Sequence, residues 1–130
     1  MIEQSTLPLV SLDSMNKVHL AEVVILNRLL EQLINKADFE LISESLEKLL
    51  EHMSAHFSSE ETLMRESNYP SFQMHKADHD KVLNQTRYAE MEWRNRKDVE
   101  ALKEHLEDDV VAWLDQHIKA MDTPMADFII

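Results

Sequence analysis

Two pairs of potential metal ligands, each spaced by four residues, most constrain how this chain can fold. The first pair is His56 and Glu60, and the second is His75 and His79. On an α-helix, a spacing of four places both side chains of a pair on one face, one turn apart. A short break around Pro70 separates the pairs, so two antiparallel helices can turn all four side chains inward. This stretch predicts a metal site inside a helical bundle, with imidazole and carboxylate ligands that suit iron, zinc or manganese.

The absence of glycine favours an all-helical protein, because hairpin turns depend on glycine. Proline, which is excluded from the interiors of helices, occurs only at positions 8, 70 and 124. Apolar residues recur at helical spacing in four segments, which lie between Asp13 and Lys36, between Asp38 and Asn68, between Pro70 and Trp93, and between Asp98 and Pro124. These lengths and the short connections predict an all-α, up-down-up-down antiparallel four-helix bundle.

All 130 residues are expected to form a single domain. It consists of an N-terminal arm over 1–12, the bundle over 14–122 and a C-terminal tail over 123–130, since Pro124 is expected to end the fourth helix. Asn68 is expected to end the second helix in the left-handed conformation that glycine would normally supply. Methionine at helical spacing usually fills the core, and this role is expected for Met53, Met64, Met74 and Met91.

The charge and the missing cysteine exclude several classes of partner and cofactor. Lys and Arg together number 13, against 25 for Asp and Glu, so the net charge is −12 and neither nucleic acid nor an anionic membrane is an expected partner. Without cysteine there can be no disulfide or iron–sulfur cluster, and nitrogen and oxygen must hold any metal. The N-terminus lacks the features of a secretion signal, and no stretch approaches the roughly 20 apolar residues of a membrane span. A soluble, cytoplasmic protein is therefore expected.

Three further ligand candidates lie in the outer helices. His19 lies within the apolar stripe of the first helix, and His117 and Asp122 lie near the end of the fourth. A spacing of five turns Asp122 somewhat off the line of His117, which suits a carboxylate that reaches sideways between two metals. Spacing alone therefore predicts five histidines and two carboxylates, with at least one ligand from each helix.

The ordered pattern of these residues resembles the hemerythrin family, and in particular the small bacterial hemerythrins. The pattern is His19, His56-x3-Glu60, His75-x3-His79 and His117-x4-Asp122, so the resemblance covers nearly the whole chain. Flanking residues agree with it as well: Asn27, Phe57, the Glu60-Glu61 pair, Met64, Tyr69-Pro70, Trp113 and Ile118.

The resemblance implies a non-haem centre with two iron ions, bridged by an oxo or hydroxo group. His75, His79 and His117 would bind one iron, His19 and His56 the other, and Glu60 and Asp122 would bridge the two. O2 would bind at the open position of the two-histidine iron, for oxygen carriage, storage or sensing, and any signalling would pass through a separate protein partner. The apolar wall of the O2 pocket would be formed by Phe57, Trp113, Leu114 and Ile118.

Glu22, three residues after His19, departs from the family pattern, which usually has an apolar residue there. Two interpretations are open: its carboxylate turns toward solvent or a surface cation, or it enters the O2 pocket. The second would favour an alternative function, a di-iron redox enzyme acting on peroxide, nitric oxide or ferrous iron. Otherwise an O2-binding protein with no catalytic residue is expected.

A third interpretation of the chain is a structural bundle whose histidines bind zinc or nothing. Asn16, which replaces a common Asp, predicts a changed environment of the ligands or a differently packed arm.

Overall fold

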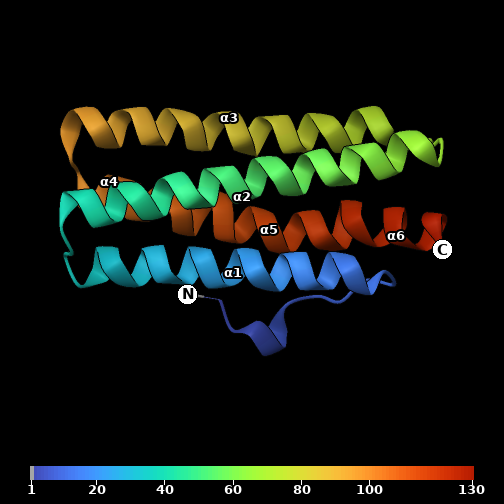
Figure 1. Ribbon diagram of the computed structural model, residues 1–130, viewed down its shortest axis with the longest axis horizontal. Coiled ribbons are helices and arrows are strands. Elements are labelled where there is room, and N and C mark those ends of the chain that lie inside the picture. Colours follow the sequence, from blue (N-terminus) through green and yellow to red (C-terminus); the bar gives the residue numbers. More distant parts are fainter. Residues whose placement is uncertain (1) are drawn as a thin grey trace.

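The structure is a computed structural model that describes residues 2–130. After an N-terminal arm, these residues form four long helical rods. Successive rods run antiparallel, and the fourth consists of several segments in one continuous line (Figure 1). The first three rods are α1 (Asp13–Ile34), α2 (Phe39–Glu66) and α3 (Phe72–Arg96). The fourth joins α4 (Val99–Glu104), η2 (His105–Val111), α5 (Ala112–His117), η3 (Ile118–Asp122) and α6 (Thr123–Ile129). The prediction of an all-α four-helix bundle is confirmed.

Each rod contributes one apolar face to the interior. In α1, for example, Leu26, Leu30 and Leu33 recur at the spacing of helical turns and are almost completely buried. Within residues 2–130 the buried apolar side chains form two clusters. Along α2 and α3 the predicted metal ligands lie where one cluster gives way to the other, so that a polar layer crosses the bundle.

Three residues near helix ends adopt the left-handed conformation in this chain without glycine. They are Lys36, Asn68 and Lys97, with φ of 52°, 55° and 52°. After α2, the Tyr69 amide donates to the Met64 carbonyl at 2.9 Å, which satisfies a carbonyl of the last helical turn. The conformation predicted for Asn68 is confirmed. At Lys36 a side chain with a Cβ occupies a position that glycine would fill at lower cost.

Pro124 does not end the fourth rod, so this expectation was wrong. The π-helical turn η3 ends at Asp122, and α6 continues the rod from Thr123 to Ile129, with Pro124 in its first turn. The regular α-helical hydrogen-bond pattern is already interrupted where η3 gives way to α6, so the N–H that proline lacks costs little there. The Thr123 hydroxyl also donates to the Ile118 carbonyl at 2.8 Å. The expected tail is therefore helical, and its Met125 packs in the second apolar cluster.

Two asparagines of α1 hold the N-terminal arm. The Asn16 side chain accepts from the Val10 amide at 2.9 Å and donates to the Val10 carbonyl at 3.0 Å. Asn27 makes the same pair of bonds with Ile2, both at 2.9 Å. The arm, which includes η1 (Gln4–Thr6), therefore lies along α1 (Figure 1). Asn16 acts on the packing of the arm, one of the two outcomes that its sequence position predicts.

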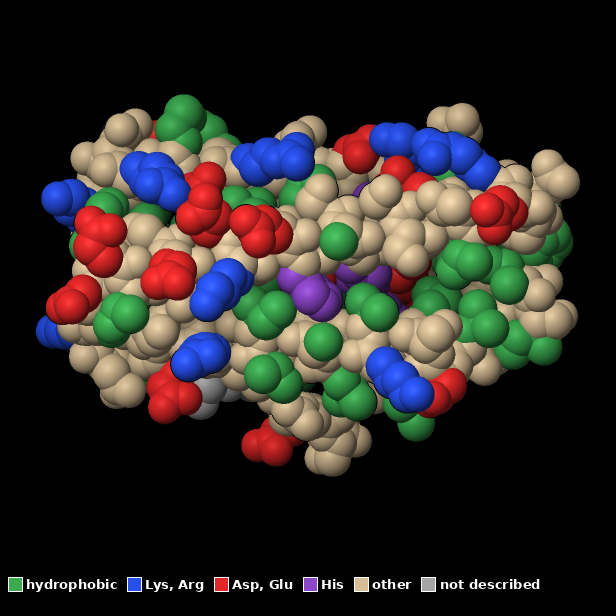
Figure 2. All heavy atoms as spheres, viewed as in Figure 1, with side chains coloured by type: hydrophobic (Ala, Val, Ile, Leu, Met, Phe, Trp, Pro, Cys, Tyr) green, Lys and Arg blue, Asp and Glu red, His purple; other side chains and the backbone are tan. Residues whose placement is uncertain are grey.

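Charged side chains of both signs cover much of the face shown in Figure 2. Histidine side chains also reach this face, midway along the seam between α1 and α2 (Figure 2). No helix within residues 2–130 is both long enough and apolar enough to cross a membrane.

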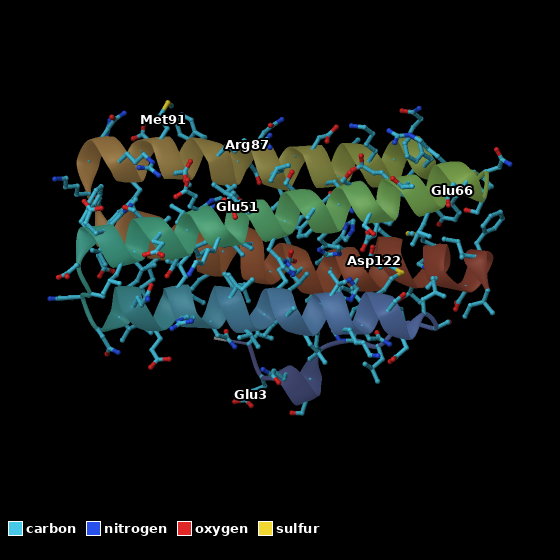
Figure 3. The ribbon with its side chains drawn as sticks, in the orientation of Figure 1. Glu3, Glu51, Glu66, Arg87, Met91 and Asp122 are labelled. Atoms are coloured by element: carbon cyan, nitrogen blue, oxygen red, sulfur yellow. The ribbon has the colours of Figure 1, made fainter. Side chains whose placement is uncertain are left out.

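The expectation that four methionines fill the core was half wrong. Met53 and Met64 are buried, whereas Met74 and Met91 are 64% and 50% exposed. Met91 points outward from α3 (Figure 3). The buried aromatic residue of this segment is Trp93, whose indole N–H donates to Ser43 Oγ at 2.9 Å. Helical periodicity alone does not show which face of α3 its neighbours cover.

Candidate metal centre

The structure brings all seven predicted metal ligands together in the buried layer of the bundle. Every rod contributes: α1 gives one histidine, α2 a histidine and a glutamate, α3 two histidines, and the fourth rod a histidine and an aspartate. The seven are at most 4% exposed. They are His19, His56, Glu60, His75, His79, His117 and Asp122.

A π-helical turn places Asp122 beside His117. Five residues of a regular α-helix would turn the two side chains well away from each other, because an α-helix repeats every 3.6 residues. The turn η3 (Ile118–Asp122) widens the helix locally, and residues five apart then share a face. His117 Nε2 lies 3.1 Å from Asp122 Oδ1. The sideways reach expected for Asp122 is thus replaced by a local change of helix type.

Three histidines form the first group of ligand atoms. His117 Nε2 lies 3.1 Å from both His75 Nε2 and His79 Nε2. Glu60 Oε1 lies 3.2 Å from His75 Nε2 and 3.1 Å from His79 Nε2. Asp122 Oδ1 completes the group, at 3.0 Å from His75 Nε2. Three imidazole nitrogens and two carboxylate oxygens therefore converge on one point.

Two histidines form the second group, which uses the other oxygen of each carboxylate. His56 Nε2 lies 2.6 Å from Glu60 Oε2, and His19 Nε2 lies 3.0 Å from Asp122 Oδ2. Glu60 and Asp122 each direct one oxygen toward the three-histidine group and one toward the two-histidine group. The carboxylates therefore have the arrangement of bridges between two adjacent cations.

The contacts around Asp122 test whether metal ions fit these residues. Both carboxylate oxygens are buried and lie 3.0–3.1 Å from imidazole nitrogens, yet neither has a hydrogen-bond partner within residues 2–130. His19 Nε2 is likewise buried without a hydrogen bond. Buried polar atoms in close contact but without hydrogen bonds are costly, and a cation held jointly by them removes that cost. Within each group, the ligand atoms lie within 4.8 Å of one another.

In the metal-free chain, the two bridging carboxylates favour the ionised form, and His19, His56 and His75 favour the protonated form. Burial raises the pKa of Glu60, but the four imidazoles around its carboxylate outweigh burial and lower that pKa well below its usual range. The imidazoles close to Asp122 lower its pKa in the same way. Burial lowers the pKa of His75, yet the nearby carboxylates of Asp122 and Glu60 raise it to about 9. Metal ions binding here would displace these protons, because a ligating imidazole nitrogen must be unprotonated.

Three further carboxylates, within the described residues, lie behind the ligating imidazoles. His56 Nδ1 lies 3.0 Å from Glu22, His79 Nδ1 lies 3.1 Å from Glu61, and His117 Nδ1 lies 2.7 Å from Asp78. A carboxylate that accepts from Nδ1–H fixes the ring orientation and leaves Nε2 free for a metal. Sequence reasoning overlooked Asp78 and treated Glu61 only as a flank. Both lie next to a ligand in sequence but contact a histidine of a neighbouring rod, which spacing along one helix does not reveal.

The carboxylate of Glu22 lies inside the bundle, at 4% exposure, so the interpretation that turned it toward solvent was wrong. Its Oε1 lies 3.1 Å from His52 Nδ1 as well as 3.0 Å from His56 Nδ1. Burial raises the pKa of Glu22, but the hydrogen bonds from His52 and His56 outweigh it and lower the pKa to about 2. Glu22 therefore contacts the nitrogen of His56 that faces away from Glu60, and His52 occupies the same carboxylate oxygen.

The aromatic residues expected around O2 contact the three-histidine group. Phe57 stacks on His79, with 4.1 Å between ring centroids, and Trp113 stacks on His117 at 4.3 Å. Leu114 and Ile118 instead pack in the second apolar cluster, which also contains Val23 and Met15, one turn on either side of His19 on α1. Phe57 also lies beside His56, with 5.1 Å between ring centroids, so it borders both ligand groups.

Comparison with known proteins identifies the family. Residues 10–129 match the model of the hemerythrin HHE cation binding domain. The chain belongs to the hemerythrin family. It is 33% identical over 112 residues to a bacteriohemerythrin of Aquifex aeolicus (strain VF5), covering 86% of this chain and 85% of that protein. It is 43% identical over 42 residues, 32% of each chain, to a bacteriohemerythrin of Methylococcus capsulatus (strain ATCC 33009 / NCIMB 11132 / Bath). No solved structure matches the chain significantly.

Hemerythrins bind iron and O2, and the chemistry of this centre agrees with iron. Imidazole nitrogen and carboxylate oxygen are suitable ligands for iron, and thiolate ligands are absent from the sequence. The family membership and the cluster of ligand atoms were both expected from the order of the seven residues in the sequence.

Proposed function

We propose that this hemerythrin binds O2 at a centre of two iron ions, for oxygen carriage, storage or sensing. The observation that carries the proposal is that Glu60 and Asp122 each direct one carboxylate oxygen toward the three-histidine group and the other toward the two-histidine group. One carboxylate could bind a single ion with both oxygens, but two carboxylates split in the same way between two groups of histidines favour two neighbouring ions.

The two ligand groups are unequal, and this inequality provides a place for O2. Three imidazoles, two carboxylate oxygens and one oxygen bridge would give six ligands, a complete octahedral set. With two imidazoles, the group formed by His19 and His56 would offer only five ligands and would leave one position for O2. Two ferrous ions held by these residues would supply the electrons for reversible O2 binding.

The residues around the two-histidine group exclude water from the open position. Leu114 and Ile118 are at most 1% exposed, and Val23 is completely buried. Water and protons promote irreversible oxidation of an O2 carrier, so a dry aliphatic environment supports reversible binding. The ring of His19 is also completely buried.

The alternative function, a redox enzyme, depended on Glu22 entering the O2 pocket. The Glu22 oxygen is already shared by His52 and His56 on the side of the ring opposite the cluster, so no contact of the structure favours this alternative. A structural bundle that holds zinc or no metal would not need the unequal division of histidines between two groups. Location in the cytoplasm and signalling through a separate protein partner remain predictions.

The proposal is tested by purifying the protein without oxygen, measuring its metals, reducing it and following the visible spectrum after air is added. We expect two irons per chain and a persistent charge-transfer band in the wild type. His105→Ala should behave in the same way, because His105 contacts Asp109 and Thr86 outside the centre. Immediate collapse of the band would favour the redox enzyme, and absence of iron would refute both functions.

A further inference from the structure

We propose that Glu22, clamped by His52, is a positioning residue for the ligand His56 and that its buried charge lowers the reduction potential of the two-histidine site. The inference rests on the proposed function insofar as the potential is that of bound iron. Positioning of His56 applies to any divalent metal that the site holds.

The clamp is formed by one oxygen and two histidines. Glu22 Oε1 lies 3.1 Å from His52 Nδ1 and 3.0 Å from His56 Nδ1. His52 and His56 are four residues apart on α2, so both rings approach α1 from the same face. With two N–H groups donating to it, the carboxylate cannot rotate away from His56 without losing both hydrogen bonds. His56 Nε2 is thereby kept directed at Glu60 Oε2, 2.6 Å away.

His52 is not one of the seven metal ligands, and its contact is with the carboxylate of Glu22. Its side chain is 23% exposed, whereas those of Glu22 and His56 are 5% and 2% exposed. Histidine side chains reach the surface midway along the seam of α1 and α2 (Figure 2). His52 thus closes the centre on the solvent side and supplies the second donor that a buried carboxylate needs.

The charge of Glu22 should affect the metals more strongly than the other carboxylates behind the histidines. Its side chain is 5% exposed, against 13% for Glu61 and 27% for Asp78. Water screens a buried charge least, so the Glu22 carboxylate has the strongest field at its histidine. A negative charge stabilises the ferric ion relative to the ferrous ion, because the ferric ion carries one more positive charge. Donation from Nδ1–H to a carboxylate also makes the imidazole a stronger ligand.

The experiment separates charge from positioning with two substitutions at one residue. Glu22→Gln keeps an oxygen that can accept from His56 but removes the charge, and Glu22→Leu removes both. We expect Glu22→Gln to retain two irons and to have a more positive midpoint potential in an anaerobic spectroelectrochemical titration. In Glu22→Leu the potential should also rise, and Co2+ should bind the two-histidine site about 10–100-fold more weakly.

Two further variants complete the test. His52→Ala should give a Co2+ affinity between those of wild type and Glu22→Leu, because one of the two donors that hold Glu22 is lost. Glu51→Gln removes a charge from an exposed position on α2 and should change neither the potential nor the affinity. Thermal unfolding of each metal-free variant reports whether it is folded.

Unchanged potential in Glu22→Gln and unchanged Co2+ affinity in folded Glu22→Leu would overturn the inference. Failure of the proposed function has a different signature. If iron is bound but no O2 adduct forms, the potentials still test the charge effect. If iron is not bound at all, Co2+ affinity still tests the positioning of His56, and a wild-type value in Glu22→Leu overturns it.

Discussion

At the scale of single residues, the centre depends on side chains whose roles are visible only across helices. The seven ligands were predictable because each has a helical spacing to another ligand or a place in a known order. Asp78 follows His75 by three residues, but the histidine that it contacts is His117, 39 residues away on another rod. The same holds for Glu22, for which the sequence showed an unusual carboxylate near His19 but not the ring that it contacts. Their roles follow from the register between rods, which spacing within a helix does not determine.

The contact between Asp78 and His117 can be tested at this scale. In Asp78→Ala, the His117 ring loses the carboxylate that accepts from Nδ1 at 2.7 Å, so we expect metal affinity of the three-histidine group to fall about 10–100-fold. Competition with a coloured chelator for Co2+ measures this change. Asp80→Ala is the matched control, because Asp80 pairs with Lys76 on the surface and should leave affinity unchanged. Equal affinity in both variants would contradict the positioning role of Asp78.

At the scale of helices, the sequence predicted the four rods well and their ends less well. The breaks between the apolar segments located the three connections, and Asp98 caps the fourth rod, because its side chain accepts from the Ala101 amide at 3.1 Å. Pro124 was wrongly predicted to end the rod because a proline normally interrupts the hydrogen bonds of a regular helix. The π-helical turn before it removes that conflict, and no simple sequence signal announces such a turn.

The left-handed residue after α1 gives a prediction about helix ends. Lys36 has φ 52°, where a Cβ is unfavourable, so Lys36→Gly is expected to raise the free energy of unfolding by about 0.5–1 kcal/mol. Chemical denaturation of the metal-free protein measures the difference. Lys48→Gly, in the interior of α2, should instead lower the free energy of unfolding by about 1 kcal/mol. Equal losses in the two variants would show that the Lys36 backbone is not strained.

The π-helical turn gives a second prediction at this scale. Deleting Ala120 from η3 should restore a regular helix and place the proline in its interior, where it costs about 3 kcal/mol. Pro124→Ala should therefore stabilise the deletion variant by about that amount, yet have little effect in the full chain. Thermal unfolding of the four metal-free proteins measures this coupling. Additive effects of deletion and substitution would mean that the π-helical turn is not what makes Pro124 tolerable.

At the scale of the whole molecule, the layer of metal ligands lies between two apolar clusters. The buried carboxylates of this layer must be neutralised by protonated histidines or by metal ions. The sequence predicted this layer but not the raised pKa values of His19, His56 and His75, which favour protons on these rings beside Glu60 and Asp122 in the metal-free protein. Protons and metal ions thus compete for the same nitrogens, and stability becomes dependent on pH.

This competition predicts that metal stabilises the fold most strongly at alkaline pH. The pKa of His75 is raised from 6.5 to about 9 in the folded metal-free chain, so its stabilising contribution is complete below pH 6.5 and is lost as pH rises through about 9. The melting temperature of metal-free protein should therefore fall between pH 6.5 and 9. Metal-loaded protein should lose less over this range, because the ligands then hold cations in place of protons. Calorimetry of both forms measures the gap between their melting temperatures, and a gap that stays constant or narrows with pH would contradict proton–metal competition.

Glu22 provides an internal check in the metal-free protein. Its pKa is lowered from 4.5 to about 2, so its contribution is present above pH 4.5 and is lost as pH falls toward 2. Glu22→Gln should therefore flatten the acid limb of the profile. It should also reduce the loss of stability at alkaline pH, because Glu22 helps to raise the pKa of His56 against the effect of burial.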